Sequence, residues 1–188
     1  MKQIFLCALI VLLWVSCKNK KKPTEDNSQF FPIASFLKSQ VAHVDTTLFS
    51  ITKLVKRDTA WDTSYVKKDD FKREASEFLT IPDLTQKQYK GNFTETKLFD
   101  ESLNKAIVTY TPTDADEATR REEVVIQPDQ GNGDKVYSIF INQLFIRKDS
   151  IIQKNMFWQV DSHFEVTTIA QKKGSPEKIQ TTRVIWGH

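Results

Sequence analysis

The chain has 188 residues, of which 39% are hydrophobic, a size that suits one domain with a core of its own. Its formal charge of +3 is uneven: Lys2 and four lysines within residues 18–22 supply five positive charges, which leaves −2 for residues 23–188. The net charge of the folded part therefore gives no indication of nucleic-acid binding, and we expect no nucleic-acid partner.

The first 16 residues have the pattern of a cleaved export signal. Lys2 precedes an apolar run over residues 4–15. As a helix this run would rise only about 18 Å, too short for a hydrocarbon core of about 30 Å. Residues 14–17 (WVSC) resemble a bacterial lipobox, in which cleavage before the cysteine exposes Cys17 for lipidation, although leucine is usual at position 14. An ordinary secretory signal with a chance cysteine is the alternative.

The remaining sequence divides at residue 30. Residues 17–29 are polar and charged, so they cannot bury enough apolar surface to offset their ordering, and we expect a lipidated, flexible basic tether. Its lysines either meet anionic headgroups or act as a solubilising spacer. Residues 30–188 form a single domain. Because Cys7 leaves with the signal and Cys17 carries lipid, this domain has no disulfide and no thiol nucleophile.

The domain opens with helical patterns. Apolar residues at helical spacing predict an amphipathic helix over about 32–42. A hairpin follows, with strands over 46–55 and 61–67 and a turn at 56–59; a second helix through Leu48, Ile51 and Val55 is the alternative. A further helix begins near Asp69 or Asp70 and carries Phe71, Ala75, Phe78 and Leu79.

From Tyr89 onward the period changes to two, which predicts strands. We expect these strands over 92–99, 105–111, 124–128, 136–146, 151–159, 163–172 and 178–186, with a charged excursion at 113–123. Apolar and polar residues alternate within 164–171, which indicates that one face of the sheet is buried and the other is exposed to solvent. The predicted fold is α+β: an antiparallel β-meander sheet covered on one face by two short N-terminal helices.

The common catalytic and cofactor-binding motifs are missing, so we predict no catalytic residue, no metal and no cofactor. The run at 161–163 holds the residue types of a Ser-His-Asp triad, but consecutive residues cannot form the full relay with one another. The acidic loop at 129–134 lacks the alternating oxygen ligands of a calcium loop, and its Asn-Gly favours a hairpin turn. Asp114, Asp116 and Glu117 favour a solvated loop over a weak cation site.

Four aromatic residues are the candidate ligand-binding side chains: Trp61, Phe157, Trp158 and Trp186. They could line an apolar or carbohydrate-binding surface, because aromatic platforms suit both kinds of ligand. The alternative is that they belong to the hydrophobic core.

The basic tether and the opening FFPIASFLKSQVAHVDTTLFSI of the domain resemble uncharacterised lipid-anchored envelope proteins of Bacteroidetes-type bacteria. This resemblance implies no activity. It implies O-glycans at Asp-Ser/Thr followed by an apolar residue or threonine, a pattern matched at Thr59, at Ser150 and within 45–47, where chance accounts for at least one match. Basic rather than acidic residues after Cys17 imply an outer-membrane position facing the periplasm.

These features predict a non-catalytic cell-envelope lipoprotein, attached to the membrane through Cys17. It would bind a partner protein or an apolar ligand between the sheet and the helices. A lipoprotein-carrier architecture fits by analogy only. An envelope hydrolase that uses scattered carboxylates is the alternative.

Replacing Cys17 with serine should remove lipidation and release the protein from membranes. Membrane fractionation of cells that express each form measures this. Complete partitioning of the Cys17→Ser protein with membranes would show that the lipobox interpretation is wrong or that a second anchor exists.

Overall fold

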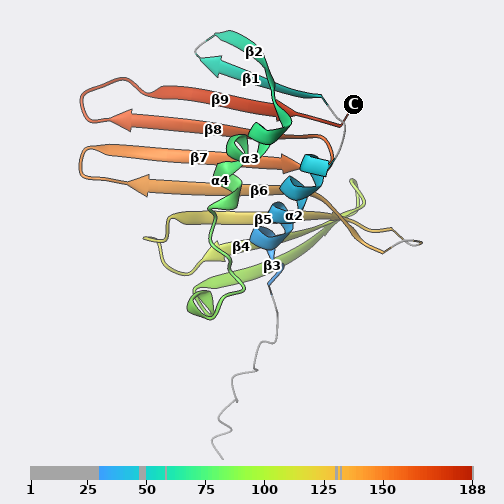
Figure 1. The fold of residues 1–188 in the computed structure, drawn as a ribbon. Coiled ribbons are helices and arrows are strands. Elements are labelled where there is room, and N and C mark those ends of the chain that lie inside the picture. The colour runs from blue at the N-terminus through green and yellow to red at the C-terminus, as the bar shows by residue number, and fades with distance from the viewer. Residues whose placement is uncertain (1–29, 47–49, 58, 130, 132, 188) are drawn as a thin grey trace, which may run out of the picture.

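Alternating side chains along the second half of the chain build one antiparallel sheet of nine strands (Figure 1). The structure is a computed structural model that describes residues 30–46, 50–57, 59–129, 131 and 133–187. The strands are β1 (Ile51–Arg57), β2 (Ala60–Val66), β3 (Phe93–Asp100), β4 (Lys105–Pro112), β5 (Thr119–Gln127), β6 (Lys135–Ile146), β7 (Ser150–Gln159), β8 (His163–Lys172) and β9 (Lys178–Ile185).

The helices within the described residues are few and mostly short. They are α2 (Ile33–Thr46), η2 (Lys68–Asp70), α3 (Phe71–Glu74), α4 (Ser76–Leu79) and η3 (Lys87–Tyr89). The second short helix predicted from the sequence, which carries Phe71, Ala75 and Phe78, is thus interrupted near Ala75, whose ψ of 6° departs from helical geometry. The sheet-dominated α+β prediction is confirmed.

The strand order is β2-β1-β9-β8-β7-β6-β5-β4-β3. Strands β3 to β9 follow one another as a meander, and the β1–β2 hairpin joins the far side of β9, where Thr52 pairs with Ile185. The structure therefore has the predicted hairpin rather than the alternative helix through Ile51 and Val55; Leu48 lies outside the described residues. The charged stretch at 113–123 is in part a strand, because Thr119 to Glu123 belong to β5.

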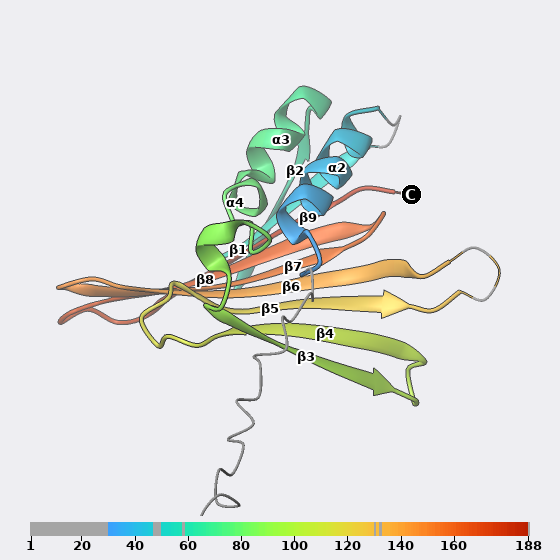
Figure 2. The ribbon, with the colours of Figure 1, turned by 90° about the horizontal axis from the view of Figure 1, so that it is seen from below.

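Figure 2 shows α2, α3 and α4 on one side of the sheet. Five aromatic rings lie at this junction: Phe71, Phe78, Trp158, Phe164 and Trp186, all buried. The Phe78 ring lies 5.2 Å from the rings of both Trp158 and Phe164. Ion pairs flank the cluster, from Lys53 to Glu74 at 2.6 Å and from Lys154 to Glu77 at 2.7 Å.

Truncating Phe78 to alanine should lower the free energy of unfolding by about 3–5 kcal/mol, because it leaves a cavity beneath α4. The matched control is Phe99→Ala: that ring is 50% exposed, so its loss should cost far less. Chemical denaturation of both variants measures the difference. Equal losses would contradict the packing described for α4.

Candidate functional site: a cleft between α2 and the sheet

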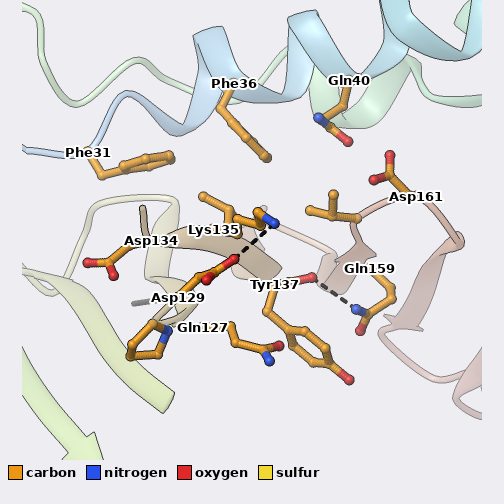
Figure 3. Close-up of a pocket in the computed structure, with 13 residues that line it drawn as sticks. Phe31, Phe36, Gln40, Gln127, Asp129, Asp134, Lys135, Tyr137, Gln159 and Asp161 are labelled. Carbon is orange, nitrogen blue, oxygen red and sulfur yellow. Dashed lines mark hydrogen bonds and ion pairs between the residues drawn. The ribbon is translucent and has the colours of Figure 1, made fainter. Parts of the chain in front are cut away.

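A cavity lies between α2 and the ends of three strands (Figure 3). Its volume is about 900 Å³. The lining residues come from the start of the domain (Phe31, Phe36, Gln40), the end of β5 and the following turn (Gln127, Pro128, Asp129), the start of β6 (Asp134, Lys135, Val136, Tyr137) and the end of β7 (Gln159, Val160, Asp161).

The helix wall of the cleft is tied to the sheet through Tyr110. The backbone N–H of Phe31 donates a hydrogen bond of 2.9 Å to the Tyr110 hydroxyl, and the Phe30 ring lies 4.9 Å from the Tyr110 ring. Burial raises the pKa of Tyr110 to about 12, so its hydroxyl stays neutral at physiological pH. Residues next to the predicted tether are thus tied to β4.

Aromatic and aliphatic side chains face one another across the cleft. Phe31 and Phe36 hold their rings 5.7 Å apart on the helix side. In Figure 3, Phe36 points from α2 toward the strands below. Val136 and Val160 are partly buried against the core on the strand side. These four side chains give the cleft an apolar wall that can take an apolar group of a ligand.

Charged residues lie around this apolar wall. Asp129, Asp134 and Asp161 contribute three carboxylates against the ammonium group of Lys135, whose Nζ lies 3.2 Å from Asp129 Oδ2. The charge of the lining is therefore −2. Cations complement such a lining electrostatically.

The far end of the cleft is shaped by a tight turn after β7. Asp161 has a positive φ of 56°, and a Cβ at Gly187 would lie only 2.3 Å from the Asp161 carbonyl oxygen. Glycine is therefore required where the end of the chain crosses this turn. The Trp186 N–H donates to the Ser162 carbonyl oxygen at 2.8 Å and closes the same junction.

The four aromatic residues proposed from the sequence do not share one surface. Trp158 and Trp186 are buried in the aromatic cluster, with ring centroids 5.1 Å apart. Phe157 follows Met156 on the opposite, open face of β7, and Trp61 lies on edge strand β2, 46% exposed. None of the four lines the 900 Å³ cleft. The residues that do line it come from separate segments, which sequence periodicity could not bring together.

The 161–163 run forms a pair rather than a relay. Ser162 Oγ lies 3.1 Å from His163 Nδ1, and no hydrogen bond joins Asp161 to this histidine among the described residues. Burial lowers the pKa of His163, and the Arg183 guanidinium lowers it further, against the effect of Glu165. A histidine with a serine neighbour and no hydrogen bond to a carboxylate among the described residues lacks the third member of a triad.

The acidic loop after β5 behaves as a turn. Asp129 accepts the Gly131 N–H on its side chain at 3.1 Å and the Gly133 N–H on its carbonyl at 3.2 Å; residues 130 and 132 lie outside the described residues. Across the described ranges, no group of three His, Cys, Asp or Glu residues could hold a metal ion.

Modification sites predicted from the sequence are spread along the chain. Thr59 lies exposed in the β1–β2 turn, and Ser150 is the first residue of β7. In the 45–47 match, Thr46 is the exposed last residue of α2, whereas Thr47, Cys17 and the signal segment lie outside the described residues. Of the helices in the described ranges, none is both long and apolar enough to cross a bilayer.

One buried carboxyl was not anticipated. Glu122 on β5 lies fully buried on the face that carries the helices, opposite Tyr110 of β4, and its Oε1 has no hydrogen-bond partner among the described residues. Burial raises the pKa of Glu122 to about 8, and the Asp83 carboxylate adds to the effect. In the sequence, the only indication that the Glu122 side chain points inward is that Glu122 lies two residues before the apolar Val124 on the same strand.

Comparisons with known proteins identify no relative. No protein-family model, no curated protein and no solved structure matches the chain.

Replacing Glu122 with glutamine should flatten the pH dependence of stability. Because the folded pKa of about 8 exceeds the ordinary 4.5, the unfolded chain releases this proton first as pH rises, so Glu122 makes the free energy of unfolding fall between these values. Glu122→Gln should therefore melt higher than the native chain above about pH 8.

Melting temperatures across this pH range measure the effect, with the exposed Glu101→Gln as control. An unchanged pH profile for Glu122→Gln would show that the Glu122 carboxyl is not held protonated in the fold.

Proposed function

We propose that the protein is a non-catalytic envelope lipoprotein, anchored through Cys17, that binds an apolar ligand or a segment of a partner protein in the cleft beneath α2. The cleft of about 900 Å³ between helix and sheet carries this proposal. Its volume lies within the range of small-molecule sites, and its apolar wall with a few polar groups is typical of them.

The chemistry of the lining favours binding over catalysis. No serine, threonine, cysteine or histidine is among the described lining residues, so these offer no thiol, no imidazole and no hydroxyl other than the phenol of Tyr137. Its carboxylates could still supply acid and base to a hydrolase, which remains the alternative. Against that alternative, the described carboxyl whose pKa is raised, Glu122, is not among the residues that line the cleft.

The charge of the lining defines the ligand further. With three carboxylates and one lysine around an apolar wall, the cleft complements an apolar group that carries a positive charge. We propose that α2, α3 and α4 cover one face of the sheet and that α2 is the helix that covers this site. Because the helix wall begins at Phe31, next to the tether, a bound ligand would lie near the route to the anchor.

Dodecyltrimethylammonium, kept below its micelle concentration, tests this proposal by calorimetric titration of the full chain. Phe36→Ala should weaken binding by about tenfold, which corresponds to the loss of part of one aromatic contact. Phe99→Ala is the matched control, because that half-exposed ring does not line the cleft.

The charge requirement is tested in the same titration. Asp134→Asn should weaken the cationic ligand and leave the uncharged alkyl chain of dodecanol unaffected, since only the former gains from the carboxylate. Native binding by a normally melting Phe36→Ala chain would exclude the cleft as the site. Hydrolysis of an ester or glycoside that is lost in Asp134→Asn would favour the alternative.

A further inference from the structure

Two hairpin turns lie side by side at one end of the sheet, at the left of Figure 1: the β6–β7 turn and the β8–β9 turn. Ser150 pairs with Lys172 where the two hairpins meet. The Lys173 N–H donates to the Asp149 carbonyl oxygen at 2.9 Å, and the Arg147 N–H donates to the Ser150 carbonyl oxygen at 2.8 Å. Residues 146–151 and 172–179 therefore form one preformed surface, the hairpin tip.

The hairpin tip exposes large aliphatic side chains. Ile146 is 67% exposed, Ile151 45% and Ile179 52%. Ile146 pairs with Ile151 across β6 and β7, and both lie on the open face of the sheet, opposite the helices. Ile179 pairs with Ile169 on the same face. Isoleucines grouped in this way on a surface indicate contact with an apolar environment.

Positive charges surround these isoleucines. The exposed cations are Arg147, Lys148, Lys172, Lys173 and Lys178, against the carboxylates of Asp149 and Glu177. The net charge of the tip is thus +3, although residues 23–188 together carry −2. None of the five cations forms an ion pair with another described residue, so all five are available to an anionic partner.

Trp61 adds an aromatic ring near the same end. It lies on β2 opposite Lys56, which pairs in turn with Thr181 of β9, two residues from Ile179. The Lys56 Nζ lies 5.8 Å from the Trp61 ring centroid. Tryptophan with neighbouring lysine is typical of side chains at a membrane–water boundary.

We propose that the hairpin tip docks on the surface of a bilayer that contains anionic lipids. Isoleucines among cations that form no ion pair with a described residue match both parts of that surface: aliphatic side chains enter the headgroup–acyl boundary, and Lys and Arg meet the lipid phosphates. A second copy of the chain that met the tip through its own tip would place +3 against +3. A nucleic acid would leave the isoleucines without an apolar partner.

The docking is independent of the anchor and of the cleft, and it is tested in the full chain. Cys7→Ser and Cys17→Ser remove the native thiols, and Ser175→Cys carries an environment-sensitive nitrobenzoxadiazole dye at the tip. Glu101→Cys carries it at the opposite end of the sheet. With vesicles of phosphatidylcholine and phosphatidylglycerol, dye emission at position 175 should shift to the blue and that at 101 should not. With phosphatidylcholine alone, the shift at 175 should be small.

Charge and aliphatic contributions are then separated by variants. A triple variant, Lys172→Gln/Lys173→Gln/Lys178→Gln, removes three charges from the tip. It should lower the ratio of docked to free tip by about 100-fold at low salt, because each lysine near an anionic surface raises this ratio several-fold. The matched control is Lys87→Gln/Lys90→Gln, two exposed lysines outside the tip. High salt should weaken docking in the native chain.

The variant Ile151→Ser/Ile179→Ser should weaken docking without lowering the melting temperature much. The control Leu98→Ser/Leu103→Ser, which changes two leucines that are somewhat more exposed, should leave docking unchanged. Equal emission at positions 101 and 175, or docking that ignores phosphatidylglycerol, would overturn the proposal. A short DNA duplex that gives the same shift, unaffected by the isoleucine variant, would identify a general polyanion surface and also overturn it.

Discussion

The aromatic cluster between the helices and the sheet is the packing on which the other features depend. Helices α3 and α4 have four residues each, far too few to be stable alone. They are held because Phe71 and Phe78 pack among Trp158, Phe164 and Trp186, with ring centroids 5.1–6.4 Å apart. Helix α2 packs against both short helices in turn. The cluster therefore positions the whole helical layer, including the helix that forms one wall of the cleft.

The two faces of the sheet differ in what they can bind. The face with the helices is packed with rings near α3 and α4 and opens into the cleft only beneath the start of α2, where Phe31 is tied to Tyr110. The open face carries polar ladders, such as the 2.7 Å hydrogen bond from Asn142 to Asn155, and becomes aliphatic and basic at the hairpin tip. In our proposals, one end of the sheet holds a cationic apolar ligand while the other meets anionic lipid.

Much of the fold could be predicted because its causes are local. The alternation of Phe164 and Val166 with Glu165 and Thr167 specifies both a strand and its buried face, and turn residues mark where each strand of the meander ends. The candidate site could not be predicted in the same way. Phe36, Asp134 and Asp161 are far apart in sequence and meet only because three strand ends lie beneath α2. Aromatic residues alone were a poor guide: Trp158 and Trp186 serve the core, while Phe157 and Trp61 lie outside the cleft.

The sequence by itself determined the strand pattern, the hairpin turns, the lack of cysteine chemistry in residues 30–188 and the lipobox-like segment, because periodicity, turn chemistry and composition act over a few residues. Only the tertiary structure decided that the β1–β2 hairpin joins β9 and that Glu122 lies buried with no partner for Oε1 among the described residues. It alone gathers five cations around three exposed isoleucines. Such features depend on which distant segments become neighbours, and pairing between distant strands is set by burial of the whole sheet rather than by local preference.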